Sequence, residues 1–283
     1  MPEFNHAGLC VNYRETGAGT PVFFQHGLGG DVSQPFGLFQ PPPGFRLLAF
    51  DCRGHGATRP LGDPAHYQIA TFASDLLALM DHLGIFRAVV GGISMGAAVA
   101  LNFALRFPER LLGLVLSRPA WLDAPNPWNV ERFSLIAKLI RQHGAKKGRD
   151  RFLQTDAYAE ALREWPDVAA SLLAQFDQAG IDQSASKLEN LINDRPVGDL
   201  LDCQSIRVPT LVLANRQDPI HPFQYGEVLA QTIPGAEFRE LTSKSVSKER
   251  HGADVQRSLD EFLTKHSALW LRSVAKSNQD RAP

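Results

Sequence analysis

Short apolar runs alternate with helical patterns in two parts of the chain. Strands are predicted over residues 8–14, 21–25, 45–50, 88–92, 111–117, 208–214 and 237–241, and helices over 71–83, 97–107 and 254–265. Most of these strands are apolar throughout, which is typical of parallel strands with helices on both faces. The pattern therefore predicts an α/β fold with a doubly wound, mostly parallel sheet.

The middle of the chain lacks this alternation. From Arg118 to about Gln204 the sequence predicts helices over 129–143, 157–165, 167–178 and 187–193, without a convincing strand. Gly144 and Pro166 stand at the predicted ends of two of these helices. We therefore expect residues 1–118 and 205–283 to form the α/β core, and residues 119–204 to be a helical insertion.

The composition narrows the class of protein. The 283 residues are 44% hydrophobic, and 29 Lys and Arg balance 30 Asp and Glu, so we expect a globular domain that does not bind nucleic acid. Because no apolar run reaches about 18 residues and the start lacks a secretory pattern, we expect a cytoplasmic protein without a membrane partner. The sequence does not indicate an oligomeric state. Three widely spaced cysteines, expected to be reduced thiols, predict neither disulfides nor a zinc site.

One five-residue motif carries a nucleophile. Gly92-Ile93-Ser94-Met95-Gly96 matches the G-x-S-x-G elbow and lies between a predicted strand and a helix of small residues. Such a turn is tight, and the glycines leave room for neighbouring backbone while the serine side chain stays exposed. Ser94 is therefore the predicted nucleophile.

A serine hydroxyl needs donors for the oxyanion that forms when it attacks a carbonyl. His26-Gly27-Leu28-Gly29-Gly30 follows an early strand and offers a glycine-rich loop. We expect the backbone N–H groups of Leu28 and Met95 to be the two oxyanion donors.

Five motifs in this order resemble the α/β-hydrolase superfamily, in its esterase, lactonase and C–C hydrolase branch: QHGLGG, DCRGHGAT, GGISMG, LVLANRQDPIHP and ERHGAD. The resemblance covers roughly residues 8–118 and 205–266. It implies that the helical insertion is a lid over an active site that binds a small-molecule substrate. No cofactor and no metal are expected, because a serine, a histidine and an aspartate suffice for this chemistry.

The resemblance implies that the base is His251, which follows the last predicted strand and stands just before the closing helix. The order Ser, Asp, His along the chain agrees with this fold. His221, three residues after Asp218, remains a competitor. The polar segment 243–250 is longer than the usual approach to this histidine, so its placement is open.

Two aspartates lie between the nucleophile and the base and could orient the histidine. Asp218 stands four residues after an apolar strand, at the edge of the sheet where parallel α/β folds bind ligands. Asp123 lies farther from its strand. We expect Asp218 to be the third member of the triad, with Asp123 as the alternative.

The substrate pocket is expected to involve His26, Trp121 and Arg118. Arg118 could bind an acidic tail of a substrate or form a structural ion pair. The function predicted from these residues is that of a serine hydrolase acting on a small, fairly apolar carboxylic ester or lactone. The alternatives are a C–C hydrolase of a diketone-like substrate and a non-enzymatic protein that uses the fold to bind a ligand.

Overall fold

A single eight-stranded sheet organises the computed structural model, which describes residues 3–279. The strands are β1 (Glu3–His6), β2 (Leu9–Gly17), β3 (Thr20–Gln25), β4 (Phe45–Phe50), β5 (Ala88–Ile93), β6 (Leu111–Ser117), β7 (Thr210–Ala214) and β8 (Glu237–Glu240). Their order is β1-β2-β4-β3-β5-β6-β7-β8. β2 pairs antiparallel with β1 and β4, and the other neighbours are parallel. The predicted mostly parallel sheet is confirmed.

Ten α-helices accompany the strands within the described residues, nine of them between strands and the tenth after β8. They are α1 (Ser33–Leu38), α2 (Ile69–His82), α3 (Met95–Arg106), α4 (Glu131–Phe152), α5 (Asp156–Glu164), α6 (Pro166–Leu173), α7 (Ile181–Ser184), α8 (Lys187–Asn190), α9 (Phe223–Thr232) and α10 (Lys248–Gln279). Short 3-10 helices cover Pro64–His66, Pro108–Arg110, Trp128–Val130, Ala174–Asp177 and Leu200–Ser205. None of the helices between residues 3 and 279 is long and apolar enough to cross a membrane.

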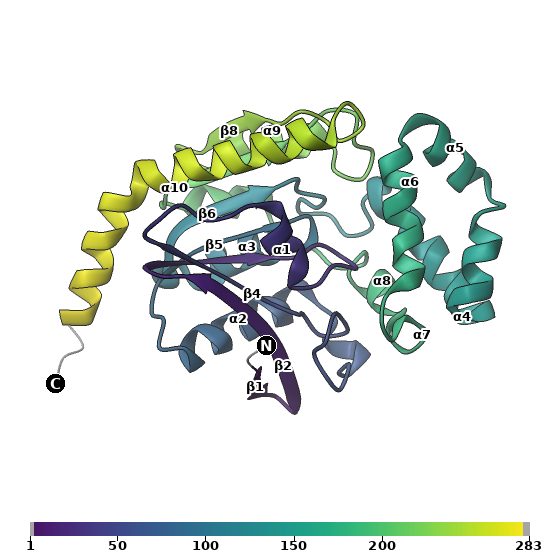
Figure 1. Ribbon diagram of the computed structural model, residues 1–283, viewed down its shortest axis with the longest axis horizontal. Coiled ribbons are helices and arrows are strands. Elements are labelled where there is room, and N and C mark those ends of the chain that lie inside the picture. Colours follow the sequence, from purple (N-terminus) through teal and green to yellow (C-terminus); the bar gives the residue numbers. More distant parts are fainter. Residues whose placement is uncertain (1–2, 280–283) are drawn as a thin grey trace.

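Helices cover both faces of the sheet. On one face, Leu259, Phe262 and Trp270 of α10 pack in a hydrophobic cluster with Val22 and Phe24 of β3. On the other face, α2 and α3 belong to a larger hydrophobic cluster that also includes Leu229 of α9. Figure 1 shows α10 along one side of the sheet and α2 along the other. The sheet is therefore doubly wound, as predicted.

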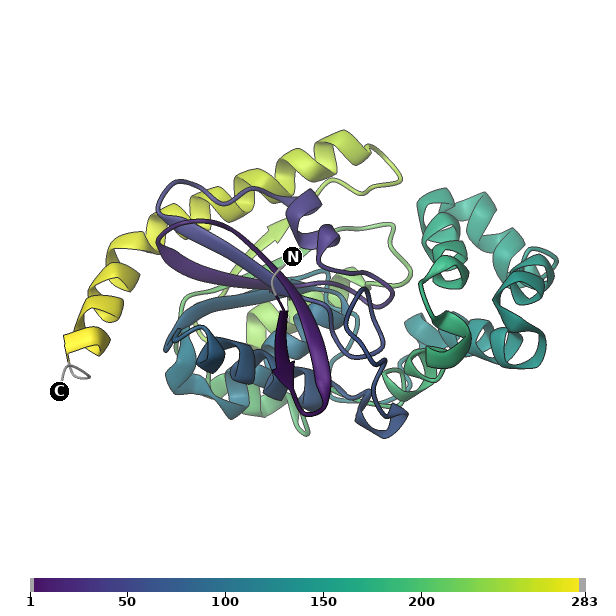
Figure 2. The same ribbon diagram turned by 60° about the horizontal axis from the view of Figure 1, so that its bottom comes forward.

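The helices α4–α8 lie between β6 and β7 in the chain and, within the described residues, no strand interrupts them. Both ribbon views place them together beside one end of the sheet (Figures 1 and 2). The predicted helix end at Gly144 is a break inside α4, where this glycine has φ 76° and ψ 162° and the chain then resumes a helix. Buried side chains of the insertion join the larger hydrophobic cluster of the core. The insertion is therefore packed on the core rather than separate from it.

Candidate active site

Ser94 occupies a strained turn between β5 and α3. Its φ is 56° and its ψ is −114°, a backbone conformation that residues with a side chain rarely adopt. Flanking side chains could not be accommodated, since a Cβ on Gly92 would lie 2.3 Å from the backbone of Gly96, and one on Gly96 would lie 2.3 Å from the Gln25 carbonyl oxygen. The two glycines thus permit the turn that holds Ser94 at the end of a central strand.

Hydrogen bonds fix the peptide that carries the Leu28 N–H. The Nε2 atom of His26 accepts the Cys52 N–H at 3.1 Å, so its proton resides on Nδ1, which lies 2.9 Å from the Gly27 carbonyl oxygen. That oxygen also accepts the Gly30 N–H at 2.9 Å. Because N–H and C=O point in opposite directions across a trans peptide, these bonds direct the Leu28 N–H away from His26.

His26 is fully buried, and its side chain serves this loop rather than the wall of the pocket, where the sequence placed it. Burial lowers its pKa below the usual value, which keeps the ring neutral at pH 7. The second expected donor, the N–H of Met95, is in the first residue of α3 and has no intrahelical partner.

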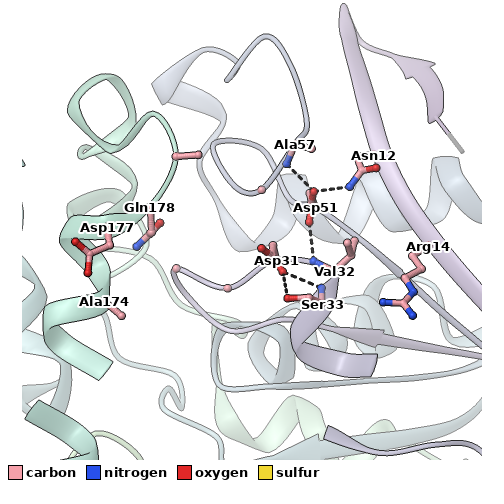
Figure 3. A pocket seen from close by; sticks show the side chains of 14 residues that line it. Asn12, Arg14, Asp31, Val32, Ser33, Asp51, Ala57, Ala174, Asp177 and Gln178 are labelled. Atoms are coloured by element: carbon pink, nitrogen blue, oxygen red, sulfur yellow. Dashed lines mark hydrogen bonds between the residues drawn. The ribbon is translucent and has the colours of Figure 1, made fainter. Parts of the chain in front are cut away.

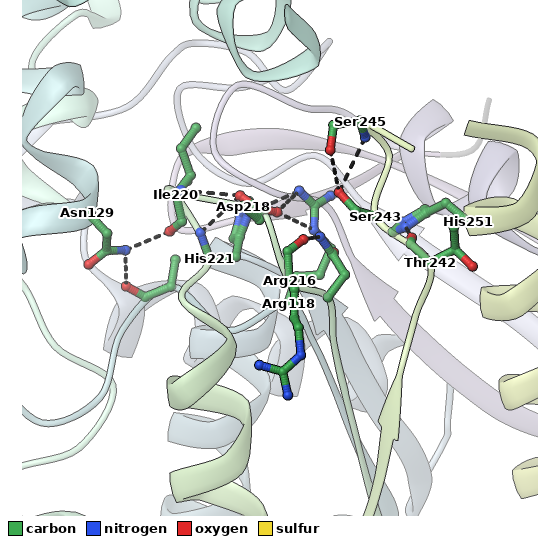
Figure 4. A network of polar contacts seen from close by, with 12 residues as sticks. Arg118, Asn129, Arg216, Asp218, Ile220, His221, Thr242, Ser243, Ser245 and His251 are labelled. Carbon is green, nitrogen blue, oxygen red and sulfur yellow. Dashed lines mark hydrogen bonds and ion pairs between the residues drawn. The ribbon is translucent and has the colours of Figure 1, made fainter. Parts of the chain in front are cut away.

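The loop after β7 forms a buried polar network with Arg118, the residue that follows β6 (Figure 4). The Oδ2 atom of Asp218 accepts Nε of Arg118 at 3.0 Å and lies 2.9 Å from Nδ1 of His221. Its Oδ1 atom accepts the N–H groups of Ile220 and His221, both at 3.2 Å. Arg118 has a φ of 49°, so a second strained residue helps to assemble the network.

Several charges set the ionisation of this network. Burial raises the pKa of Asp218, but His221 and Arg118 outweigh it, and the pKa lies well below the usual range. Burial and the Arg118 charge lower the pKa of His221, whereas Asp218 raises it, and the net shift is downward. At pH 7 the network therefore contains a carboxylate, a guanidinium and a neutral imidazole.

His251 lies in a different environment from that expected. It belongs to the first turn of α10, which begins six residues before the predicted start of the closing helix. Its Nδ1 atom is 2.8 Å from the Thr242 carbonyl oxygen, and its buried Nε2 atom has no partner. In the described part of the chain, no hydrogen bond joins His251 to Asp218, and Figure 4 shows the carboxylate engaged by Arg118 and His221 instead.

A cavity of about 440 Å³ brings several of these groups together. Its walls include Leu28, Ser94, Arg118, His221, Lys244 and Lys248. His251 is not part of this lining. Ser94 is 9% exposed, and among the described residues its hydroxyl forms no hydrogen bond with either histidine. Such bonds often tighten only when substrate is present.

Two further residues from the sequence analysis lie away from this cavity. Trp121 is 2% exposed and packs in the larger hydrophobic cluster, so it does not form a pocket wall in this structure. Asp123 accepts the Leu200 N–H through Oδ2 at 3.3 Å, and its carbonyl accepts Arg195 at 3.1 Å. It holds together parts of the insertion and, within residues 3–279, forms no hydrogen bond with a histidine.

A second cavity of about 490 Å³ lies between the loop 29–33 and the segment 174–179 (Figure 3). The buried carboxylate of Asp51 accepts hydrogen bonds from the side-chain amide of Asn12 at 2.6 Å and from the N–H groups of Val32 and Ala57, both at 2.7 Å. These hydrogen bonds give Asp51 a structural role in connecting the loops around it. Within residues 3–279, no group of three or more His, Cys, Asp or Glu could hold a metal ion.

Sequence reasoning missed the charged residues on the cavity wall. Lys244, Lys248 and Asp167 line the cavity together with Ser94. The unusual length and charge of the segment 243–250 were the only signal that could have revealed the two lysines. Asp167 belongs to the insertion, where no motif indicates a binding role.

The doubly wound sheet and the serine elbow together define the α/β hydrolase fold. A family model described as the alpha/beta hydrolase fold matches residues 20–245, and the chain belongs to this family.

A protein of Pseudomonas savastanoi pv. phaseolicola, named as a proposed carbamate hydrolase, is 33% identical over 222 residues, which cover 77% of this chain and 83% of that protein. The 3-oxoadipate enol-lactonase 2 of Acinetobacter baylyi is 29% identical over 252 residues, covering 84% and 87% of the two chains. The crystal structure of an enol-lactonase from Burkholderia xenovorans superposes with a TM-score of 0.69 at 28% identity, covering 93% of this chain and all 100% of the other. The names of these relatives indicate a hydrolase of this fold.

Proposed function

We propose that this protein is a serine hydrolase that cleaves a small carboxylic ester or lactone through an acyl-enzyme on Ser94. The observation that carries the proposal is the shared cavity of Ser94 and His221, with Asp218 bonded to the far nitrogen of the imidazole. The lactonase names of two similar proteins support the substrate class.

In the proposed reaction, Nε2 of His221 accepts the proton of Ser94 as its Oγ attacks the substrate carbonyl. The N–H groups of Leu28 and Met95 stabilise the oxyanion, and Asp218 stabilises the imidazolium. His221 then protonates the leaving alkoxide. A water molecule, deprotonated by the same nitrogen, hydrolyses the acyl-enzyme and restores Ser94.

His221 fits the role of base for a reason that the sequence motif alone did not give. A base must hold a free nitrogen toward the nucleophile while its other nitrogen is oriented by an acceptor. In His221 the acceptor is Asp218, and Nε2 is left for the cavity. Asp218 can only accept a hydrogen bond, so its contact with Nδ1 at 2.9 Å favours the tautomer with the proton on that nitrogen. Nη2 of Arg118 is a donor 3.1 Å from the same nitrogen and favours the other tautomer; the proposed reaction uses the first.

His251 remains the second candidate for the base. Its Nε2 atom is buried without a partner, which costs free energy unless the group is used. Burial lowers its pKa to about 4, so the ring is neutral at pH 7 and could accept a proton. Its orienting acceptor would be the Thr242 carbonyl rather than Asp218.

We also propose that residues 119–204 act as a lid. Asp167, Val168 and Ser171 of α6 form part of the cavity wall. Nε2 of Gln175 donates a hydrogen bond to the Leu28 carbonyl at 3.4 Å. This bond connects the insertion to the loop that carries the proposed oxyanion donor. Movement of the insertion would therefore change access to Ser94 and the position of this loop together.

A fluorophosphonate probe and a substrate panel test the proposed function. We expect the probe to label the wild type and not Ser94→Ala, and we expect hydrolysis of small p-nitrophenyl esters or lactones that this variant abolishes. Equal labelling of both proteins would refute the assignment of Ser94. Turnover of a vinylogous diketone without turnover of any ester would favour C–C hydrolysis, and labelling without turnover of any substrate would favour a binding protein.

A further inference from the structure

Lys244 lines the cavity that contains Ser94, and its ammonium group is unpaired within the described residues. It follows β8, is partly buried, and forms no hydrogen bond or ion pair within the described residues. Burial and the Arg118 charge lower its pKa to about 8, so most molecules carry the positive charge at pH 7. A partly buried charge without a partner is unfavourable for the folded protein, which makes a ligand its natural partner.

The other charged groups around the cavity do not satisfy Lys244. Arg118 is paired with Asp218, so these two charges compensate each other. Lys248 stands in the first turn of α10, where the helix dipole disfavours a positive charge. Two lysines thus face the cavity in positions that do not stabilise the fold.

Asp167 is the acidic residue on the same wall. It lies in the first turn of α6, where the helix dipole favours a carboxylate, and its buried Oδ1 atom has no hydrogen-bond partner within the described residues. Its field acts on Lys244, but no ion pair joins the two side chains. Positive charge therefore remains in excess around the cavity.

We propose that the cavity binds an anionic substrate: a small ester or lactone that carries a carboxylate, which Lys244 binds directly and Lys248 attracts at the rim. This inference rests on the proposed ester or lactone hydrolysis and specifies its substrate class. The cavity volume of about 440 Å³ accommodates such a molecule. Binding would give the Lys244 ammonium the partner that the protein does not provide.

Matched pairs of esters test the charge preference. The monomethyl esters of succinate, glutarate and adipate are compared with methyl butanoate, pentanoate and hexanoate, in which a methyl group replaces the carboxylate. We expect the wild type to have a kcat/KM for the best anionic ester that exceeds that of its neutral partner by about tenfold or more, as for a hydrogen bond to a charged group. In Lys244→Met this ratio should fall about tenfold, chiefly through the KM of the anionic ester.

Two control variants separate local binding from general charge effects. Lys146→Met removes an exposed lysine of α4 outside this cavity and should leave the ratio unchanged. Asp167→Asn removes the opposing charge and should raise the ratio. A ratio near one in the wild type, or an equal ratio in the wild type and Lys244→Met, would overturn the anionic subsite.

Different experimental results would contradict the anionic subsite and the proposed ester hydrolysis. Labelling of Ser94 with hydrolysis of neutral esters, but no preference for anionic ones, would remove only the subsite. If no ester is turned over, calorimetry with glutarate decides: the wild type should bind it more tightly than Lys244→Met by about tenfold, and an equal affinity or no binding contradicts the inference.

Discussion

The chain segments that follow β7 and β8 both contain a histidine, but the two side chains have different partners. After β7, Asp218 and His221 contact each other and Arg118 at the wall of the Ser94 cavity. After β8, His251 is turned toward the Thr242 carbonyl and its second ring nitrogen has no partner. The difference shows that the order of motifs along a chain does not determine which side chains meet.

Local geometry accounts for the difference. Asp218 accepts the N–H groups two and three residues later, so its loop curls back and brings His221 to the carboxylate. His251 instead belongs to α10, whose early start withdraws it from the loop. The three-residue spacing between Asp218 and His221 was therefore a better guide to contact than the position of His251 near the last helix.

The largest expected effect is the loss of the nucleophile, on which both histidine assignments depend. Ser94→Ala should lower kcat by about 10⁴- to 10⁶-fold, as expected when a nucleophilic serine is removed. Ester hydrolysis and probe labelling measure the loss. A variant with more than about a tenth of wild-type kcat would exclude an acyl-enzyme on this residue.

Exchanging each histidine for glutamine tests the comparison directly. His221→Gln should lower kcat by about 10³-fold or more, because the base and the later acid are lost together. His251→Gln should cost less than about tenfold, since its ring is outside the cavity lining. Steady-state kinetics with thermal melts of both variants provide the measurement. A larger loss at 251 would restore the triad expected from the sequence.

The two aspartates give the next largest contrast. Asp218→Asn should lower kcat by about 10²- to 10⁴-fold, through loss of the His221 tautomer and of support for the imidazolium. It also leaves the Arg118 charge buried without its partner, which should destabilise the fold by about 3–5 kcal/mol. Asp123→Asn should change kcat by less than about threefold, because this side chain accepts the Leu200 N–H within the insertion and forms no hydrogen bond with Ser94, His221 or His251 among the described residues.

Circular dichroism must accompany these kinetics, so that a folding defect in Asp218→Asn is not mistaken for a catalytic one. If the folded Asp218→Asn retains wild-type kcat while Asp123→Asn does not, the acid lies in the insertion and the network after β7 is structural.

The sequence predicted the strands and the turn that carries the nucleophile better than the contacts between side chains that are far apart in the chain. The strands 45–50 and 111–117 have the predicted bounds, and Ser94 lies on the expected elbow, because strand burial and the glycine elbow are local properties. The pairing of Asp218 with His221 and Arg118 depends on two loops that are 100 residues apart. No periodicity encodes such a contact.

The pH dependence of kcat/KM should also distinguish His221 from His251, with a smaller effect than the substitutions above. Because the pKa of His221 is lowered, the neutral base predominates above that pKa, and activity should be lost only as the pH falls through a midpoint below 6.5. This shift is opposite to the one expected from a nearby carboxylate alone, since burial and Arg118 outweigh Asp218. His251→Gln should leave the kcat/KM profile unchanged. A profile that shifts in this variant would show that the loop after β8 contributes to the titration.

The smallest expected change in catalysis concerns Trp121, which the sequence suggested as a pocket wall. Its side chain is 2% exposed and packs with the larger hydrophobic cluster, so Trp121→Ala should lower the free energy of unfolding by about 3–5 kcal/mol. KM and the preference for acyl chain length should change by less than about twofold in the folded fraction, because no cavity wall is altered. Urea unfolding measures the first effect, and kinetics below the unfolding transition with esters of increasing acyl length measure the second. A clear change in chain-length preference with little loss of stability would mean that Trp121 reaches the substrate, and that the cavity extends beneath the insertion when substrate is bound.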